Sequence, residues 1–258
     1  AGAILNSYEK SNTFNGFVII FSLGMIANFG CIYFIKKQYE PKDTIDDEVT
    51  EIDKASAKMN NGLKRFIAYD SLSEFSFHIS GPLMMVYWLR DLKFDYIELA
   101  ILINVSQILG LFSMRYWGKR IDKDGSFSTI RFTSFCIAIF PIFWVGIYYL
   151  PNELTLAGSI IIASMASLMF SGRALALDNR LYEHMKNKKM IKVTSKRVFF
   201  RGLSIFIGGL IGGVITKNES SLSIFVKLDT VIHAVMVFST VLRLGVWSYF
   251  LIDKRSEI

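Results

Sequence analysis

The chain has 258 residues, 52% of them hydrophobic, and its mean hydropathy of +0.38 excludes an ordinary soluble domain. The formal net charge of +7 does not indicate a nucleic-acid-binding protein, because the basic residues lie in short segments between apolar runs. Cys31 and Cys136 lie inside two separate apolar runs, so no disulfide is expected.

Seven apolar runs are predicted to cross a lipid bilayer as helices, because about 20 helical residues span a hydrocarbon core. In chain order they are 14–35, 66–89, 96–114, 132–150, 154–177, 198–216 and 228–251. The second run is the least hydrophobic. We include it because two Lys/Arg-rich segments, the linker before it and 115–131, would otherwise lie on opposite sides of the membrane. Gly81-Pro82 within this run predicts a bend, since proline removes a backbone donor.

The basic residues orient the predicted helices. Of the 29 Lys and Arg residues, 22 fall on one side of the predicted membrane and five on the other. Short basic loops stay in the cytoplasm, so the N-terminus is predicted outside and the C-terminus inside, in the cell membrane. The sequence therefore predicts an all-α integral membrane protein in three parts: a first helix within 1–36, a polar cytoplasmic linker at 37–64, and a six-helix bundle at 65–258.

A charged segment, 115–131, joins the third and fourth predicted spans on the inner side. Its residues Gly118, Asp122, Lys123 and Gly125 resemble the G-x-x-x-D-[RK]-x-G loop of the major facilitator superfamily. That family carries the loop between its second and third helices and, in weaker form, between its eighth and ninth. The pattern departs at 126–127, where Ser and Phe replace the family's basic pair.

The physical chemistry of this segment allows two interpretations. Gly118 and Gly125 permit a sharp turn between helix ends, and Asp122 is expected to accept hydrogen bonds from a neighbouring helix start. Together with Lys123, these residues would form a conformational latch on the inner side. The alternative is a charged and well-solvated loop without such a role.

The resemblance implies that the chain corresponds to helices six to twelve of a twelve-helix transporter. The first helix would end the N-terminal half, the linker would be the central cytoplasmic loop, and 65–258 would form the C-terminal half. The missing N-terminal helices would be a partner of this chain, which would be a fragment of a longer gene product or a degenerate half. The implied function is secondary transport of a small solute by alternating access.

Polar side chains inside the predicted spans are candidates for a substrate or proton pathway. Asp70, Glu74 and His78 are spaced by four residues and so form a ladder on one helix face. A charge at the centre of a bilayer costs about 2.5–3.5 kcal/mol on insertion scales, so these groups should face a cavity or another helix. Arg173 lies at similar depth in the fifth span. It is expected either to pair with a carboxylate as an inner gate or to extend to the headgroups.

Two further features lie in the last two spans. Gly208, Gly209, Gly212 and Gly213 form overlapping GxxxG patterns, which predict close helix packing rather than a hinge. Arg243 and His233 are expected to be peripheral, because the twelfth helix of the resembled family lies outside the substrate cavity.

Seven spans with an external N-terminus also fit a membrane receptor or sensor without transport activity. An enzyme is not predicted, because the sequence has no HExxH motif, no paired-aspartate signature and no Ser/His arrangement deep in the spans. No metal site and no cofactor are expected. The expected partners are membrane lipids, a small-molecule substrate and the missing helices, with no nucleic acid.

Overall fold

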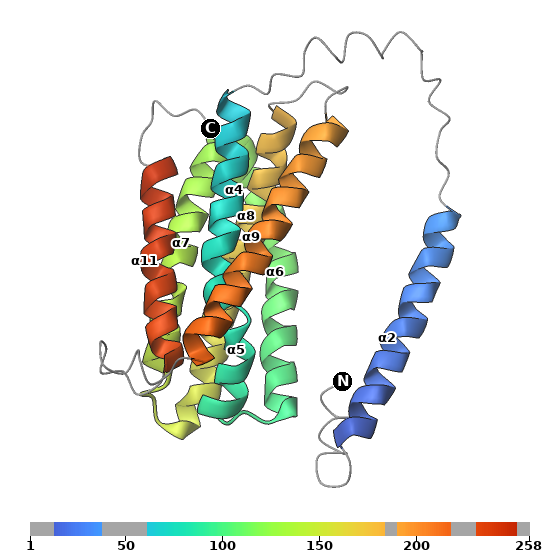
Figure 1. Cartoon of the computed structure of the whole chain (residues 1–258), viewed down its shortest axis with the longest axis vertical. Helices are drawn as coiled ribbons and strands as arrows, with labels where there is room; N and C mark the ends of the chain where they lie inside the picture. The colour runs from blue at the N-terminus through green and yellow to red at the C-terminus, as the bar shows by residue number, and fades with distance from the viewer. Residues whose placement is uncertain (1–12, 38–60, 184–189, 218–230, 252–258) are drawn as a thin grey trace. The chain divides into compact units, whose positions relative to one another are not determined.

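The structure, a computed structural model, describes residues 13–37, 61–183, 190–217 and 231–251 (Figure 1). All regular secondary structure in these residues is helical. The chain divides into two compact units, residues 1–60 with 95–100 and residues 61–94 with 101–258, and each is considered by itself. Most of the predicted linker lies outside the described residues.

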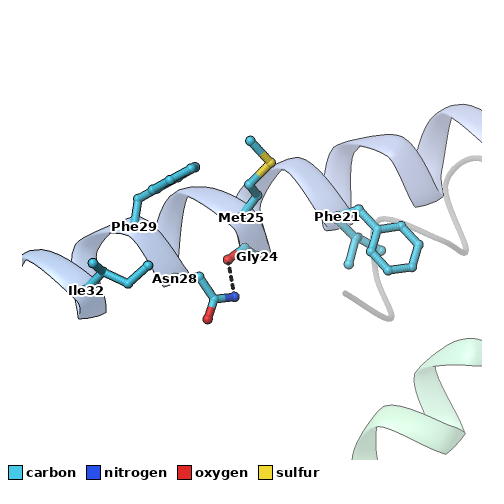
Figure 2. A pocket seen from close by; sticks show the side chains of 7 residues that line it. Phe21, Gly24, Met25, Asn28, Phe29 and Ile32 are labelled. Carbon is cyan, nitrogen blue, oxygen red and sulfur yellow. Dashed lines mark hydrogen bonds between the residues drawn. The ribbon is translucent and has the colours of Figure 1, made fainter.

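The first unit contains α2 (Thr13–Lys36), a helix without a charged residue before its last position. Its large apolar side chains are exposed, among them Phe21 and Phe34. Figure 2 shows a hollow along one face of α2, whose lining residues recur every three or four positions: Ile20, Phe21, Gly24, Met25, Asn28, Phe29 and Ile32. Asn28 Nδ2 donates a hydrogen bond to the Gly24 carbonyl at 3.0 Å, so this amide is bonded within its own helix.

The second predicted span is interrupted at Gly81-Pro82, at the position of the predicted bend. Helix α4 (Asn61–Ser80) ends there, and a short helix α5 (Leu83–Val86) and a π-helical turn η1 (Tyr87–Asp91) follow. The Gly81 amide still donates to the Phe77 carbonyl at 3.0 Å. Pro82 has no N–H to continue the pattern, so α4 breaks rather than curves.

Five helices of the described residues are long and apolar enough to cross a membrane. They are α6 (Tyr96–Asp124), α7 (Ser126–Ile147), α8 (Asn152–Glu183), α9 (Met190–Lys217) and α11 (Val231–Leu251). This set indicates a multi-pass membrane protein. The apolar part of α2 is shorter, and α4 carries too many charges for the same criterion. Their crossing, and with it the count of seven, stays a prediction.

The segment 115–131 is not the short charged loop between two helix ends that the sequence predicts. Helix α6 continues to Asp124 and α7 begins at Ser126, so Gly125 alone separates them. Gly125 has φ of 83° and ψ of 157°, a conformation open essentially only to glycine. Gly118 lies inside α6, and the expectation that it forms part of the turn is wrong. The apolar run ends at 114, but its helical hydrogen bonding persists for almost three more turns.

Helix α4 lies in the interior of the second unit, against α9 and α11, while α7 packs against α8 and α11 (Figure 1). The contact between α4 and α9 depends on two glycines. A Cβ atom on Gly208 would lie 2.6 Å from the carbonyl oxygen of Phe75. A Cβ atom on Gly212 would lie even closer to the carbonyl oxygen of Ile79. Gly209 and Gly213 have no such close neighbour. The close approach of the two helices therefore involves one residue of each glycine pair.

Helix α6 is attached to α8 through another glycine contact. The indole of Trp117 lies over Gly172, where a Cβ atom would be 2.5 Å from the ring. Trp117 Nε1 donates to the Leu168 carbonyl at 2.8 Å, so this buried side chain is both packed and hydrogen-bonded. The contact lies immediately beside Arg173, the residue that follows Gly172 in α8.

Candidate functional site

A network of charged side chains lies inside the second unit, and Asp70 on α4 is its most buried member. This residue has no exposed surface. Its Oδ2 atom is 2.7 Å from Arg197 Nε on α9, and its Oδ1 atom is 3.4 Å from Arg173 Nη2 on α8. One carboxylate thus binds two guanidinium groups from two different helices.

Glu74 lies one turn further along α4 and repeats this arrangement. Its Oε1 atom is 3.2 Å from Arg173 Nη1 and 3.2 Å from Arg201 Nη2. His78, another turn on, places Nδ1 2.9 Å from the Glu74 carbonyl oxygen and 3.6 Å from Oε2. The ladder expected from the spacing of these three residues is therefore present on α4, and its charged part faces α8 and α9.

The network extends to the surface through α8. Arg197 Nη1 donates to Asp178 Oδ1 at 2.9 Å, and the Asp178 side chain is 60% exposed. Arg201 is also partly exposed, at 44% of its side chain. The network therefore connects a fully buried carboxylate to groups accessible from outside the bundle.

Three carboxylates face three guanidinium groups in this network, so its formal charges balance. Aromatic rings complete the environment: Arg173 lies 4.9 Å from the ring centroid of Phe77, and Arg197 lies 5.5 Å from that of Phe66. Buried ion pairs recover their desolvation cost only when geometry and additional bonds are good. Removing a buried member, such as Asp70 or Arg173, would leave an uncompensated charge in the interior.

The network includes all four residues that the sequence places on the substrate or proton pathway. Asp70, Glu74 and Arg173 are ion-paired, and His78 is bonded at the edge. The four residues of the predicted latch take no part in it. Asp122 and Lys123 are exposed on the last turns of α6. The N-cap residue of α7 is Gly125, which has no side chain to cap the helix. The expected bonds from a neighbouring helix start to Asp122 stay a prediction.

Sequence reasoning misses two arginines, Arg197 and Arg201. It places Arg197 in a basic loop, whereas this residue lies in the third turn of α9. A signal is available, because Arg197 and Arg201 have the same four-residue spacing as Asp70 and Glu74. Two neighbouring helices with opposite charges at equal spacing can form ion pairs in register.

Arg243 and His233 of α11 are both buried, so the expectation that they are peripheral is wrong. Arg243 Nη1 donates to the Ile137 carbonyl at 3.2 Å. Pro141, four residues later in α7, has no N–H to offer this carbonyl, so the guanidinium group replaces the missing helical donor. Arg243 also donates to Ser80 and Ser239, which ties α11 to the end of α4.

The chemistry that the network shows is ion pairing between carboxylates and guanidinium groups. In the described part of the chain, no group of three or more His, Cys, Asp or Glu side chains gathers to hold a metal ion. A comparison with known protein families, curated proteins and solved structures finds no match to this chain.

Proposed function

We propose that this chain is the C-terminal half of a secondary transporter of small solutes, with the last helix of the N-terminal half attached, similar in plan to the major facilitator superfamily. It would lie in the cell membrane with its C-terminus in the cytoplasm. The observation that carries the proposal is the buried ion-pair network joining α4, α8 and α9 through Asp70, Glu74 and Arg173. Charged groups inside membrane bundles are costly, and they commonly line substrate or ion pathways.

The network has the properties required of a reversible contact between helices. Each pair joins two helices through side chains alone, so the pairs can separate without breaking a helix. Arg197 contacts one buried and one exposed carboxylate, and so connects the interior to the surface. In the proposed mechanism, the pairs form when the inner side of the transporter closes and separate when it opens.

Glu74 is the residue through which a proton would couple to this motion. Its partners Arg201 and His78 are partly exposed, whereas Asp70 is enclosed by two buried arginines. Protonation of Glu74 would weaken its contacts with both Arg173 and Arg201. The proposal therefore assigns Glu74 to proton coupling and Asp70 to holding the helices together.

The test is uptake by sealed vesicles from cells that express the complete gene, against panels of sugars, amino acids and drugs. Glu74→Gln should lower uptake of the transported solute at least tenfold, whereas the matched control Glu153→Gln, at an exposed position on α8, should not change it. The exchange Glu74→Arg with Arg173→Glu should restore part of the activity. Uptake equal to that of vesicles lacking the protein, for every solute, would contradict the proposal. Full uptake activity of the Glu74→Gln variant would show that the ion-pair network has no role in the proposed transport.

A further inference from the structure

We propose that a small cavity between α4, α7 and α11 binds a single halide-sized anion beside Arg243. The proposal concerns a site outside the ion-pair network, and it does not depend on the transport function. It rests on three features: a buried cation without a carboxylate, a cavity with room for one small particle, and a wall that presents hydrogen-bond donors.

Arg243 is buried and forms no ion pair with any carboxylate in the part of the chain that the structure describes. Its acceptors are the hydroxyls of Ser80 and Ser239 and the backbone carbonyls of Phe77 and Ile137, all of which are neutral. These dipoles stabilise the guanidinium group but leave its full positive charge in the interior. A buried charge without a counter-ion is strongly unfavourable.

The neighbouring network cannot supply the missing negative charge. Its three carboxylates already face three arginines. Arg173 and Arg243 each lie 4.9 Å from the ring centroid of Phe77, so the two cations share one ring. The positive potential at Arg243 is therefore raised by its neighbour, which favours a bound anion.

The cavity lies directly against Arg243, and Tyr69, Ser73 and Ser134 also line it. It has room for one water-sized particle, about 10 Å³. Phosphate, sulfate and carboxylate ions are too large for this space. A monatomic anion such as chloride is larger than water but smaller than these ions, and it enters if the surrounding hydroxyls move apart.

The wall of the cavity presents donors. Tyr69 Oη and Ser134 Oγ are 2.6 Å apart, and since only one of them donates in this bond, the other hydroxyl hydrogen is left over. Arg243 has five N–H groups, of which four have acceptors among the described residues. No carboxylate lines the cavity. Such a set of donors suits an anion better than a cation.

The test compares the thermal unfolding of the purified 258-residue chain in detergent, in chloride and in gluconate at constant ionic strength. Gluconate is too large for the cavity. We expect the unfolding temperature to rise with the logarithm of the chloride concentration once that concentration exceeds the Kd for chloride, as for any ligand of the folded state. Bromide should act similarly. Equal unfolding temperatures in chloride and gluconate at all concentrations would overturn the proposal and leave the cavity to water.

Two variants locate the site. Arg243→Gln should abolish the chloride response, whereas Arg90→Gln, at a side chain that is 55% exposed, should preserve it. Ser73→Ala removes one hydroxyl from the wall and should raise the chloride concentration needed for half of the shift by roughly tenfold. If Arg243→Gln does not fold, the halide series on the unaltered protein and on Ser73→Ala decides the question. An unchanged chloride response in Ser73→Ala and Arg243→Gln would place the anion elsewhere and refute the site.

Discussion

Arg197 Nε lies 2.7 Å from Oδ2 of Asp70, and through this contact α9 is bound to the interior of α4. The same carboxylate holds Arg173 of α8 through its other oxygen. Asp70 therefore joins three helices in a place that water does not reach. Each helix alone would carry an unpaired charge into the interior, so the three charges stabilise the fold only together.

Asp70→Asn is expected to lower the stability of the bundle sharply. The substitution keeps the shape of the side chain but leaves two buried guanidinium groups with one carboxylate partner fewer, at a cost of about 3–5 kcal/mol. Thermal unfolding in detergent measures the effect. The control Asp124→Asn disrupts an exposed pair with Arg120 and should change stability by less than about 1 kcal/mol. Similar losses of stability in Asp70→Asn and Asp124→Asn would show that the burial of the ion pairs of Asp70 is unimportant.

Gly212→Ala should destabilise the contact between α4 and α9, while Gly213→Ala should not. A methyl group at Gly212 would collide with the Ile79 carbonyl oxygen, which is a backbone atom and cannot rotate away, whereas Gly213 has open space around it. Overpacking of this kind costs about 1–3 kcal/mol. The two variants are adjacent in sequence and chemically identical, so a comparison of their unfolding temperatures isolates the packing term. Equal temperatures would contradict the close approach of the helices.

Gly125→Ala and Gly118→Ala should have opposite effects. Gly125 has φ of 83° and ψ of 157°, where an alanine is strained by about 1–3 kcal/mol. Gly118 is helical, and a methyl group added to it would have no neighbouring atom within 4 Å, so alanine there should stabilise α6 by about 0.5–1 kcal/mol. Unfolding temperatures that fall for both variants would place the turn at Gly118 as well, as the loop pattern predicts.

The sequence predicts the helical class, and it offers the pairing of Arg173 with a carboxylate of α4 as one of two alternatives, because both follow from local patterns. Apolar runs of about 20 residues have few alternatives to helices, and an arginine at the depth of two carboxylates has few alternative partners. Arg197 falls in a loop when hydropathy alone defines the start of the helix. Charged residues lower hydropathy whether they face solvent or a buried carboxylate, so the boundary of α9 cannot be found without its partner.

The corner between α6 and α7 illustrates the same limit. A run of charges predicts where the apolar segment ends but not where helical hydrogen bonding ends. Arg120 and Asp124 are spaced by four residues and lie 3.5 Å apart, a pairing that favours the continuation of α6 to its last residue. The burial of Arg243 cannot be predicted either, since it depends on Pro141 and Ile137 of a helix distant in sequence.

The contact between Arg243 and α7 yields a prediction about Pro141. Arg243→Met should destabilise the bundle, partly because the Ile137 carbonyl is left without a donor in the interior, at about 1–3 kcal/mol. Pro141→Ala restores a backbone N–H four residues after Ile137, so in the double variant part of that loss should disappear. The measurement is a double-mutant cycle of unfolding temperatures at fixed chloride concentration. Strictly additive effects would show that the guanidinium group does not replace the helical donor.

The predicted orientation can be tested at the two ends of α7. Its 22 residues extend over about 33 Å, close to the thickness of a hydrocarbon core. Lys123 precedes the start of α7 and Asn152 follows its end, and both are exposed. The two variants Asn152→Cys and Lys123→Cys are made in a background without Cys31 and Cys136. A membrane-impermeant maleimide added to intact cells should label Asn152→Cys at once. It should label Lys123→Cys only after permeabilisation, because basic segments stay in the cytoplasm. The reverse order of labelling would invert the topology, and immediate labelling of both would argue that α7 does not span the membrane.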